Sequence, residues 1–365
     1  MIPCAYRALA WLVQNEGRMK HTMRLPKLLF TSLLLAACGT PEDAELPGVD
    51  VMDNDPPLAG AADVRRDAPK ADEIAFEGKA DTVLPASYDI VSLQTPVRNQ
   101  SRRGVCSIFS TIGLMESLYK KAGMSSPDFS EQYLQWSVKN QVGAYANTEG
   151  SSDSYNLRAI STYGIPLESA WPYQPDPWTE VNDAACKTGG TSLPTRCYTN
   201  GEPPAAARAA KMYKLPTGRW VSTSSIKNII FEKRQGVVVG LDFFYQAWNH
   251  RRSALPVSTA DFSRGIVRFP NATDQQKSRE TPAGHSVQLV GWNDNLSFQT
   301  VDAAGKPVVD AAGKPVLEKG FFIFKNSWGT ANFGLTNPKG AGYGYISYRY
   351  VSQYGSGYTA DPPKL

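Results

Sequence analysis

The fold is decided by the stretch GVCSIFSTIGLMESLYKKAG, residues 104–123. Apolar side chains at positions 108, 109, 112, 115 and 119 have the spacing of a helix with one buried face. Lysines at 120 and 121, followed by glycine at 123, are typical of a helix C-terminus. We therefore predict a helix over residues 106–122, with Cys106 at its N-terminus.

The segments after this helix indicate that helices come first and strands later. Ser130 is a suitable N-cap for a helix over 131–139, and two more helices are expected over 154–163 and 224–234. A loop rich in Pro and Gly fills residues 172–218. Short runs typical of β-strands follow at 237–244, 265–269, 286–292, 320–326 and 344–350. This order predicts an α+β fold with two lobes.

Composition limits the classes of partner. The 365 residues are 42% hydrophobic and 20% charged, which is ordinary for a globular protein, and the net charge is only +4. No basic stripe with interleaved aromatic residues occurs in the sequence, so we expect no nucleic-acid partner. No Cys/His cluster has the spacing of a zinc site, and we expect no metal or other cofactor. The oligomeric state is not predicted.

The N-terminus has the pattern of an export signal. Lys20, Arg24 and Lys27 precede an apolar run, residues 28–37, which ends in Leu-Ala-Ala before Cys38. These features are typical of a secretory signal peptide, and the run is too short to span a bilayer. A cysteine directly after Leu-Ala-Ala is similar to a bacterial lipobox, which implies cleavage before Cys38 and its lipidation. The alternative is an ordinary signal peptide and a secreted protein.

The lipobox pattern predicts an exported protein anchored in the bacterial cell envelope, in the outer membrane and on its periplasmic or surface side. The predicted organisation has four parts: a leader and lipoprotein signal peptide over 1–37, an acidic Pro/Ala-rich tether over 38–82, a folded domain over 83–358 with a helical lobe at about 95–180 and a β lobe at about 219–352, and a tail over 359–365. The tether lacks apolar periodicity and is predicted to be disordered, with a folded inhibitory pro-segment as the alternative.

The five cysteines divide into four groups. Cys4 lies in the leader, and Cys38 is the expected lipid site. Cys186 and Cys197 flank a Gly- and Pro-containing loop and can close a small disulfide, which an exported context permits. Cys106 is then the one cysteine with no assigned role.

One internal repeat has no expected chemistry. The segment VDAAGKPV at residues 301–308 recurs unchanged at 309–316. Two copies are too few for a solenoid, and we predict a lengthened hairpin between two strands.

Cys106 has the local setting of a reactive thiol. A cysteine attacks as the thiolate, and the start of a helix favours that negative charge. A nucleophilic cysteine also needs a base. The sequence has three histidines, of which His21 falls in the signal segment, leaving His250 and His285. His250 stands beside two arginines in a polar loop and is predicted to be solvated rather than catalytic.

Five motifs, in order along residues 84 to 350, together resemble the papain/cathepsin family of cysteine peptidases. They are LPASYD at 84–89, TPVRNQ with GVCSIFS at 95–110, GIPLESAWPY at 164–173, GHSVQLVG at 284–291, and KNSWG at 325–329 with GYGYI at 342–346. The resemblance implies a papain-like fold, with a helical lobe, an antiparallel β-barrel-like lobe and a cleft between them.

The resemblance also implies a role for each matching residue. Cys106 is the expected nucleophile, His285 its base and Asn326 the residue that orients the imidazole. Gln100 and the Cys106 backbone N–H are expected to stabilise the oxyanion. Trp328 is expected to shield the bond between Asn326 and His285 from water. The implied substrate is a protein or peptide, cleaved through an acyl-enzyme, with endopeptidase action expected.

The chain departs from the family pattern at several positions. Arg103 and Ser137 replace two cysteines of the family, so both disulfides of the helical lobe are absent and apolar packing is expected to hold it. Ser107 replaces the tryptophan that usually follows the nucleophile. The expected cleft residues are Gly150, Ser151 and Ser152, which replace a Gly-Gly wall, together with Gly284 and Trp328. These changes leave two alternatives open, a catalytically silent peptide-binding protein and a transpeptidase that uses the same acyl-enzyme.

Overall fold

Helix α3, Cys106–Lys121, crosses the middle of the molecule, where the sequence predicts a helix. The structure, a computed structural model, describes residues 58–59, 82–187 and 192–365, all of which lie in one compact unit. Every residue of α3 from Cys106 to Tyr119 is buried, so the expectation of a single buried face is wrong. The reason is that α3 packs against helices α4 and α5 on one side and against strands β3 and β5 on the other.

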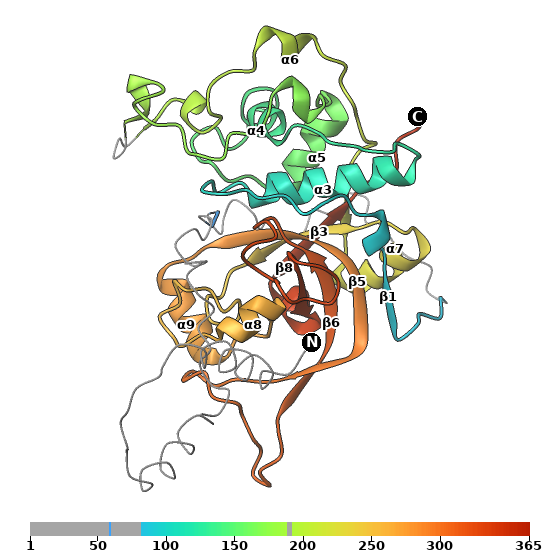
Figure 1. The fold of residues 1–365 in the computed structure, drawn as a ribbon, viewed down its shortest axis with the longest axis vertical. Coiled ribbons are helices and arrows are strands. Elements are labelled where there is room, and N and C mark those ends of the chain that lie inside the picture. The colour runs from blue at the N-terminus through green and yellow to red at the C-terminus, as the bar shows by residue number, and fades with distance from the viewer. Residues whose placement is uncertain (1–57, 60–81, 188–191) are drawn as a thin grey trace, which may run out of the picture. The chain divides into compact units, whose positions relative to one another are not determined.

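The helical lobe is built from two more helices beside α3 (Figure 1). They are α4, Glu131–Asn140, and α5, Asp153–Thr162. The predicted N-cap of α4 is confirmed, because the Ser130 hydroxyl accepts a hydrogen bond from the Tyr133 N–H at 3.0 Å. A short helix α6, Ala205–Ala209, and the 3₁₀ turns Glu168–Ala170, Ala184–Cys186 and Thr195–Cys197 lie in the long segment beyond α5.

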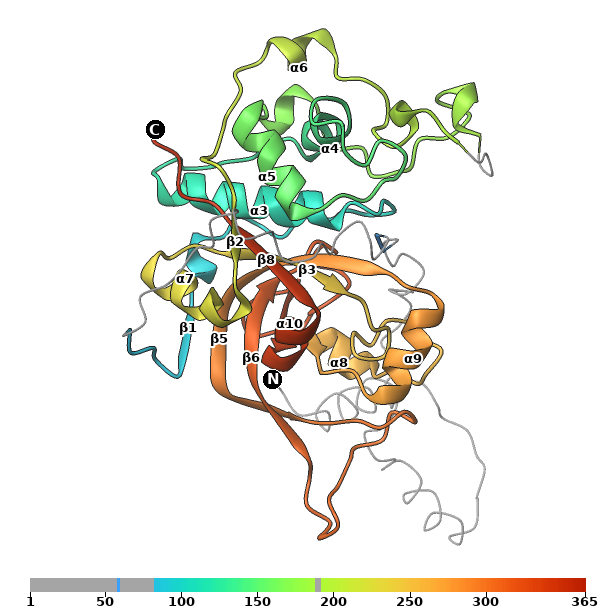
Figure 2. The same cartoon turned by 180° about the vertical axis from the view of Figure 1, so that it is seen from behind.

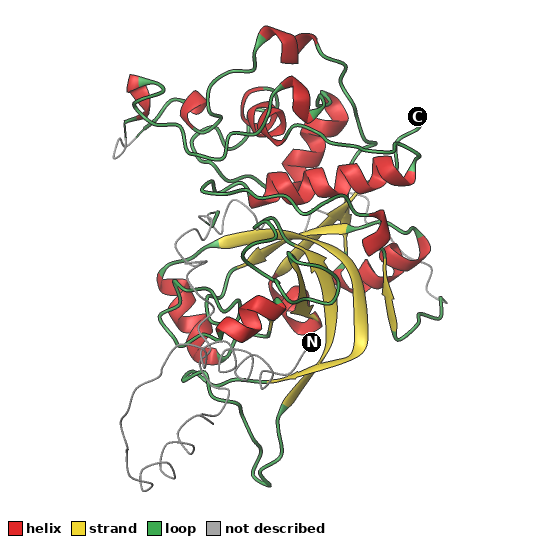
Figure 3. Ribbon diagram, in the orientation of Figure 1, coloured by secondary structure: helices red, strands yellow, loops and turns green. Residues whose placement is uncertain are grey.

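The second lobe is a sheet with helices around it, as Figure 3 shows by colour. Its strands are β1 Ser87–Asp89, β2 Arg219–Val221, β3 Val237–Asp242, β4 Ile266–Val267, β5 Gly284–Gln299, β6 Leu317–Lys325, β7 Tyr343–Ser347 and β8 Gly355–Thr359. Its helices are α7 Ile226–Glu232, α8 Thr259–Arg264, α9 Ala272–Glu280 and α10 Tyr348–Tyr354, with 3₁₀ turns at Val91–Leu93 and Thr223–Ser225.

The strand order is β2-β8-β3-β5-β6-β7-β4, with β1 also paired to β5. All pairs are antiparallel except β4 and β7, which are parallel at the edge of the sheet. Successive side chains of strand β3 point alternately into the core of the β lobe and the core of the helical lobe. Val237 and Val239 pack into the β-lobe core, whereas Val238 packs into the core of the helical lobe. This shared strand joins the two lobes beneath α3.

The C-terminal part differs from the predicted strand at 344–350. Strand β7 ends at Ser347, whose hydroxyl accepts a hydrogen bond from the Tyr350 N–H and caps helix α10. Strand β8 follows and enters the sheet between β2 and β3. A strand was not expected there, because the run GSGYT has little β-type composition.

The duplicated segment forms the connection between β5 and β6, which Figure 2 shows extending from the end of the sheet. Each copy makes the same turn. The Asp302 carboxylate accepts hydrogen bonds from the N–H groups of Ala304 and Lys306, both at 2.9 Å. Asp310 does the same one repeat later. The prediction of a lengthened hairpin is confirmed.

Candidate active site

Cys106 is the first residue of α3 and is fully buried. The backbone of Ser286, the residue after His285, hydrogen-bonds to the Cys106 sulfur. The helix N-terminus favours a thiolate, but burial has the larger effect and raises the pKa of the thiol to about 12. In this structure the thiol is therefore protonated at neutral pH.

His285 on β5 forms a direct hydrogen bond with Asn326, the residue that follows the last residue of β6. The distance from His285 Nε2 to Asn326 Oδ1 is 2.8 Å. The Ser327 N–H also donates to Asn326 Oδ1, at 2.9 Å, which identifies this atom as the amide oxygen. Nε2 must then carry the hydrogen, and Nδ1 is left as an acceptor. Nδ1 has no hydrogen-bond partner among the described residues.

Aromatic rings surround the imidazole of His285. Trp328 lies at 4.7 Å, Trp248 at 5.1 Å and Phe243 at 6.1 Å between ring centroids. These rings exclude water, and the resulting burial lowers the pKa of His285 to about 4. A second histidine, His250, lies beside the same rings and is fully buried. The prediction that His250 is solvated is therefore wrong, because a polar sequence neighbourhood does not report tertiary burial.

Gln100 is fully buried beside the nucleophile segment. Its Oε1 accepts from the Ser327 hydroxyl at 2.6 Å, and its Nε2 donates to the Arg103 carbonyl at 2.8 Å. A side-chain amide has two N–H groups, so one donor of Gln100 is left after the bond to Arg103. The two bonds hold the amide in one orientation.

The expected cleft wall is held to α3 by hydroxyl groups. Ser151 Oγ lies 2.9 Å from Ser107 Oγ and donates to Asn156 Oδ1 at 2.8 Å. Ser152 is the N-cap residue of α5, and the Gly150 carbonyl accepts from Lys139 Nζ at 3.1 Å. Ser107, where the family has tryptophan, is thus part of a hydrogen-bond chain that a tryptophan would not make.

An ion pair with a buried arginine helps to hold the helical lobe. The Arg103 guanidinium is fully buried and donates from Nε to Glu149 Oε1 at 2.9 Å. Its other nitrogens donate to Gln132 Oε1 and to the carbonyls of Gln174 and Tyr198. The sequence predicts that apolar packing alone holds the helical lobe. The structure shows that these polar contacts of Arg103 hold it as well. No short-range pattern around Arg103 indicates these partners.

Leu58 and Ala59, from the predicted tether, lie over the site. The Gly284 N–H donates to the Ala59 carbonyl at 2.7 Å, and the Ala59 backbone also hydrogen-bonds to the Cys106 sulfur. Ala59 packs on Cys106, and Leu58 packs on the β-lobe core. The contact was not predicted, because two small apolar residues in a polar stretch have no periodicity.

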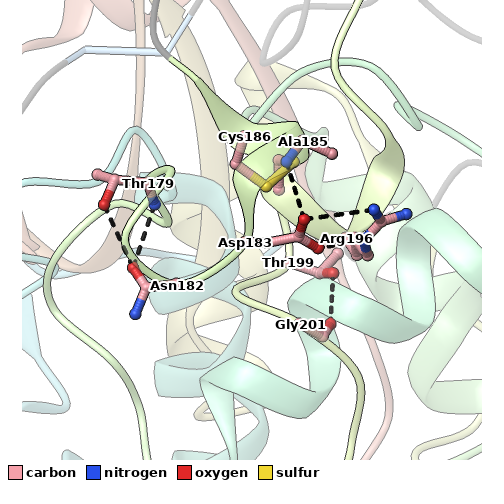
Figure 4. The surroundings of a disulfide bond; sticks show 9 residues. Thr179, Asn182, Asp183, Ala185, Cys186, Arg196, Thr199 and Gly201 are labelled. Atoms are coloured by element: carbon pink, nitrogen blue, oxygen red, sulfur yellow. Dashed lines mark hydrogen bonds and ion pairs between the residues drawn. A yellow bond between two sulfur atoms is a disulfide. The ribbon is translucent and has the colours of Figure 1, made fainter.

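The two remaining cysteines of the described chain form a disulfide, Cys186–Cys197 (Figure 4). Asp183 accepts hydrogen bonds from the Ala185 N–H at 2.9 Å and from Arg196 Nε at 2.5 Å beside it. The disulfide closes a loop of the long segment that follows the helical lobe.

Several expectations concern residues outside the described ranges, namely the leader over 1–37, the lipid site at Cys38 and most of the tether. Over the described part of the chain, no helix has the length and apolar character that crossing a membrane requires. The same residues contain no group of three or more His, Cys, Asp or Glu side chains placed to hold a metal ion.

The sequence matches a known protein family. The family described as papain family cysteine protease matches residues 84–348. The chain therefore belongs to the papain family of cysteine proteases. None of the curated proteins compared with the sequence matches it.

Solved structures share the fold. Xylellain, a cysteine protease from Xylella fastidiosa, superposes with a TM-score of 0.58 at 15% identity over 84% of this chain and 97% of that chain. The cysteine protease and lectin-like domains of Cwp84 from Clostridium difficile give 0.51 at 20% identity, over 80% and 54%. A procathepsin B from Trypanosoma congolense gives 0.51 at 15%, over 84% and 87%. At these identities the likeness shows the two-lobe α+β fold.

Proposed function

We propose that this chain hydrolyses peptide bonds with Cys106 as nucleophile, His285 as its base and Asn326 as the residue that orients the base. The observation that carries the proposal is the hydrogen bond from His285 Nε2 to Asn326 Oδ1. This bond fixes the tautomer in which Nδ1 is a free acceptor, on the strand whose next residue reaches the Cys106 sulfur.

The reaction needs no group beyond these side chains and water. The Cys106 thiol gives its proton to His285 Nδ1, and the sulfur bonds to the substrate carbonyl carbon. The C–N bond then breaks, and the imidazolium returns the proton to the leaving amine. A water molecule next gives a proton to the imidazole and attacks the thioester. Cleavage of the C–S bond releases the acid, and the proton returns to the thiolate.

Two donors are available for the oxyanion. As the first residue of α3, Cys106 has a backbone N–H without an intrahelical acceptor. Gln100 supplies its second amide N–H beside it. Removing one such donor costs about 2.7–4 kcal/mol of transition-state stabilisation, so Gln100→Ala should lower kcat by about 10²–10³-fold.

Labelling with a peptidyl epoxide tests the assignment. The wild-type protein should be labelled once per chain, on Cys106, and Cys106→Ala should not be labelled. His285→Ala should be labelled much more slowly, since it lacks the base. His250→Ala is the control, because it removes a buried imidazole but keeps the base. A folded wild type that resists labelling and cleaves no peptide would support the silent binding protein instead. Mass analysis of products with an added amine separates hydrolysis from transpeptidation.

We also propose export and lipid anchoring at Cys38, which rest on the sequence pattern of residues 20–38. Blocking lipoprotein signal cleavage with globomycin should leave an uncleaved precursor in a bacterial host. Cys38→Ser is the matched variant and should be found in the soluble fraction. If both treatments leave processing and membrane association unchanged, the anchor is not at Cys38.

A further inference from the structure

A buried acidic group lies close to the candidate site, and neither the sequence nor the proposed mechanism assigns it a role. Asp153, the first residue of α5, is 1% exposed. It accepts hydrogen bonds from three hydroxyls, Ser286 at 3.0 Å, Ser110 at 3.1 Å and Thr111 at 3.2 Å. Ser110 and Ser286 also lie within 2.6 Å of each other. One carboxylate thus collects hydroxyls from both lobes.

The positions of these hydroxyls connect the cluster to the reacting residues. Ser110 lies one helical turn after Cys106 on α3, and Ser286 directly follows His285 on β5. Fixing Ser286 against Ser110 therefore fixes the strand of the base against the helix of the nucleophile. The imidazole of His285 has one hydrogen bond among the described residues, to Asn326, and it otherwise packs against aromatic rings.

The same cluster continues to the cleft wall. Thr111 Oγ1 accepts from Asn156 Nδ2 at 3.2 Å, and Asn156 Oδ1 accepts from Ser151 Oγ. Ser151 in turn lies beside Ser107. Asp153 is the carboxylate of this hydrogen-bonded cluster, and it thereby links the wall, the nucleophile helix and the histidine strand.

The charged and titratable groups around Asp153 are few. On α3, Asp153 raises the pKa of the Cys106 thiol electrostatically. On β5, the titratable residue next to Ser286 in sequence is His285. On α4, Lys139 donates to the carbonyls of Glu149 and Gly150 at the wall. On β3, Asp242 is paired in register with Gly284. Burial raises the pKa of Asp153 itself to about 7, so its charge changes near neutral pH.

We propose that Asp153 is a positioning residue of the cysteine protease site, which holds the His285 strand against the Cys106 helix and whose charge sets the pH range in which the thiol reacts. This inference rests on the proposed function. It assigns Asp153 no contact with substrate.

The experiment measures two quantities on the full chain, the pH midpoint of Cys106 alkylation by iodoacetamide and kcat/KM for a quenched-fluorescent casein. Asp153→Asn should move the alkylation midpoint to lower pH, because the charge that opposes the thiolate is gone. It should also lower kcat/KM by about 10- to 100-fold, because an amide donates where the carboxylate accepted and displaces Ser286. Asp153→Glu keeps the charge, so the midpoint should stay near that of the wild type.

Asp274 offers a matched control. It is also 1% exposed, lies in the first turn of α9, and accepts from a serine hydroxyl, Ser278, and from the backbone N–H groups of Gln246 and Ala247. Burial raises its pKa too, but in the described part of the chain no hydrogen bond or ion pair joins it to Cys106 or His285. Asp274→Asn should leave the alkylation midpoint unchanged.

Ser286→Ala removes the hydrogen bond between Ser286 and Asp153 but keeps the charge of Asp153. It replaces Asp153→Asn if that variant does not fold. It should lower kcat/KM by about tenfold without moving the alkylation midpoint to lower pH. A folded Asp153→Asn with wild-type midpoint and kcat/KM overturns the inference and leaves the proposed function standing, and so does wild-type kcat/KM in Ser286→Ala. A wild type that neither reacts with iodoacetamide at Cys106 nor cleaves casein overturns both.

Discussion

The two residues proposed to react lie in unlike surroundings. Beside the N-terminal turn of the Cys106 helix lies a cluster of hydroxyls and a carboxylate, joined by hydrogen bonds through Ser107, Ser110 and Asp153. Around His285 they are aromatic rings. Hydrogen bonds are directional and fail when one atom is removed, whereas packed rings act through volume and the exclusion of water. The helical side of the site is therefore held by polar contacts and the strand side by packing.

The largest effect is expected on the aromatic side. Trp328 is 1% exposed and contacts the rings of His285, Trp248 and Phe333. Trp328→Ala should cost about 3–5 kcal/mol of unfolding free energy, by loss of buried surface and formation of a cavity. Water would also reach the bond between His285 and Asn326 and weaken it.

Urea denaturation and kcat/KM for a peptide substrate measure the two consequences of Trp328→Ala. Trp178→Ala is the control. Trp178 is half-buried in the loop before the disulfide, so its removal should cost much less unfolding free energy. Equal losses in both variants would show that the aromatic side has no special weight.

The next effect is an opposite pH dependence of stability in the two regions. Burial lowers the pKa of His285 to about 4, below its usual 6.5, so the unfolded chain binds more protons in this range. Stability contributed by neutral His285 is lost as pH falls from about 6.5 to about 4, by about 3 kcal/mol. Asp153 has a raised pKa of about 7, so its contribution is present at low pH and is lost as pH rises toward 7.

Urea midpoints between pH 4 and 8 test this contrast. His285→Gln should remove the loss of stability as pH falls from about 6.5 to about 4, and Asp153→Asn should remove the loss of stability as pH rises toward 7. Curves that stay parallel to the wild type in both variants would contradict the assignment of these two groups.

A smaller effect concerns the segment above the thiol. Ala59 is 4% exposed and packs on Cys106, so Ala59→Glu cannot keep this contact. Displacing the segment returns water to the sulfur and lowers the thiol pKa. Alkylation at neutral pH should rise about tenfold for each unit by which that pKa falls. Ala59→Gly keeps the carbonyl bonded to Gly284 and should react near the wild-type rate, and equal rates in all three proteins would refute the covering role.

The smallest effect is expected for the hydrogen bond between Ser107 and Ser151. Ser107→Ala or Ser151→Ala should each cost about 0.5–1.5 kcal/mol of unfolding free energy. The double variant should cost less than the sum, because either substitution already removes the shared bond. Strictly additive losses would mean that the two hydroxyls are not coupled. Thermal unfolding of the four proteins completes the cycle.

Local features were predicted well. Helix α3 begins at Cys106 and α4 at Glu131 as expected, since N-cap residues and apolar spacing act over one or two turns. The strand that ends just before Asn326 was also expected, and so was the strand of His285, although β5 begins two residues before the predicted start at 286 and is longer than predicted. The burial of His250 and the parallel pairing of β4 with β7 were not, because both depend on elements distant in sequence.

Sequence alone determined the family, the order of helices and strands, and the residues proposed to react, because these depend on motifs and periodicities a few residues long. Tertiary structure decided what surrounds them. It brought Ser286 to Ser110 at Asp153, Glu149 to Arg103 and Ala59 to Cys106. Each of these contacts joins segments about 40 to 180 residues apart, so it forms only when the lobes pack and desolvate the groups they enclose.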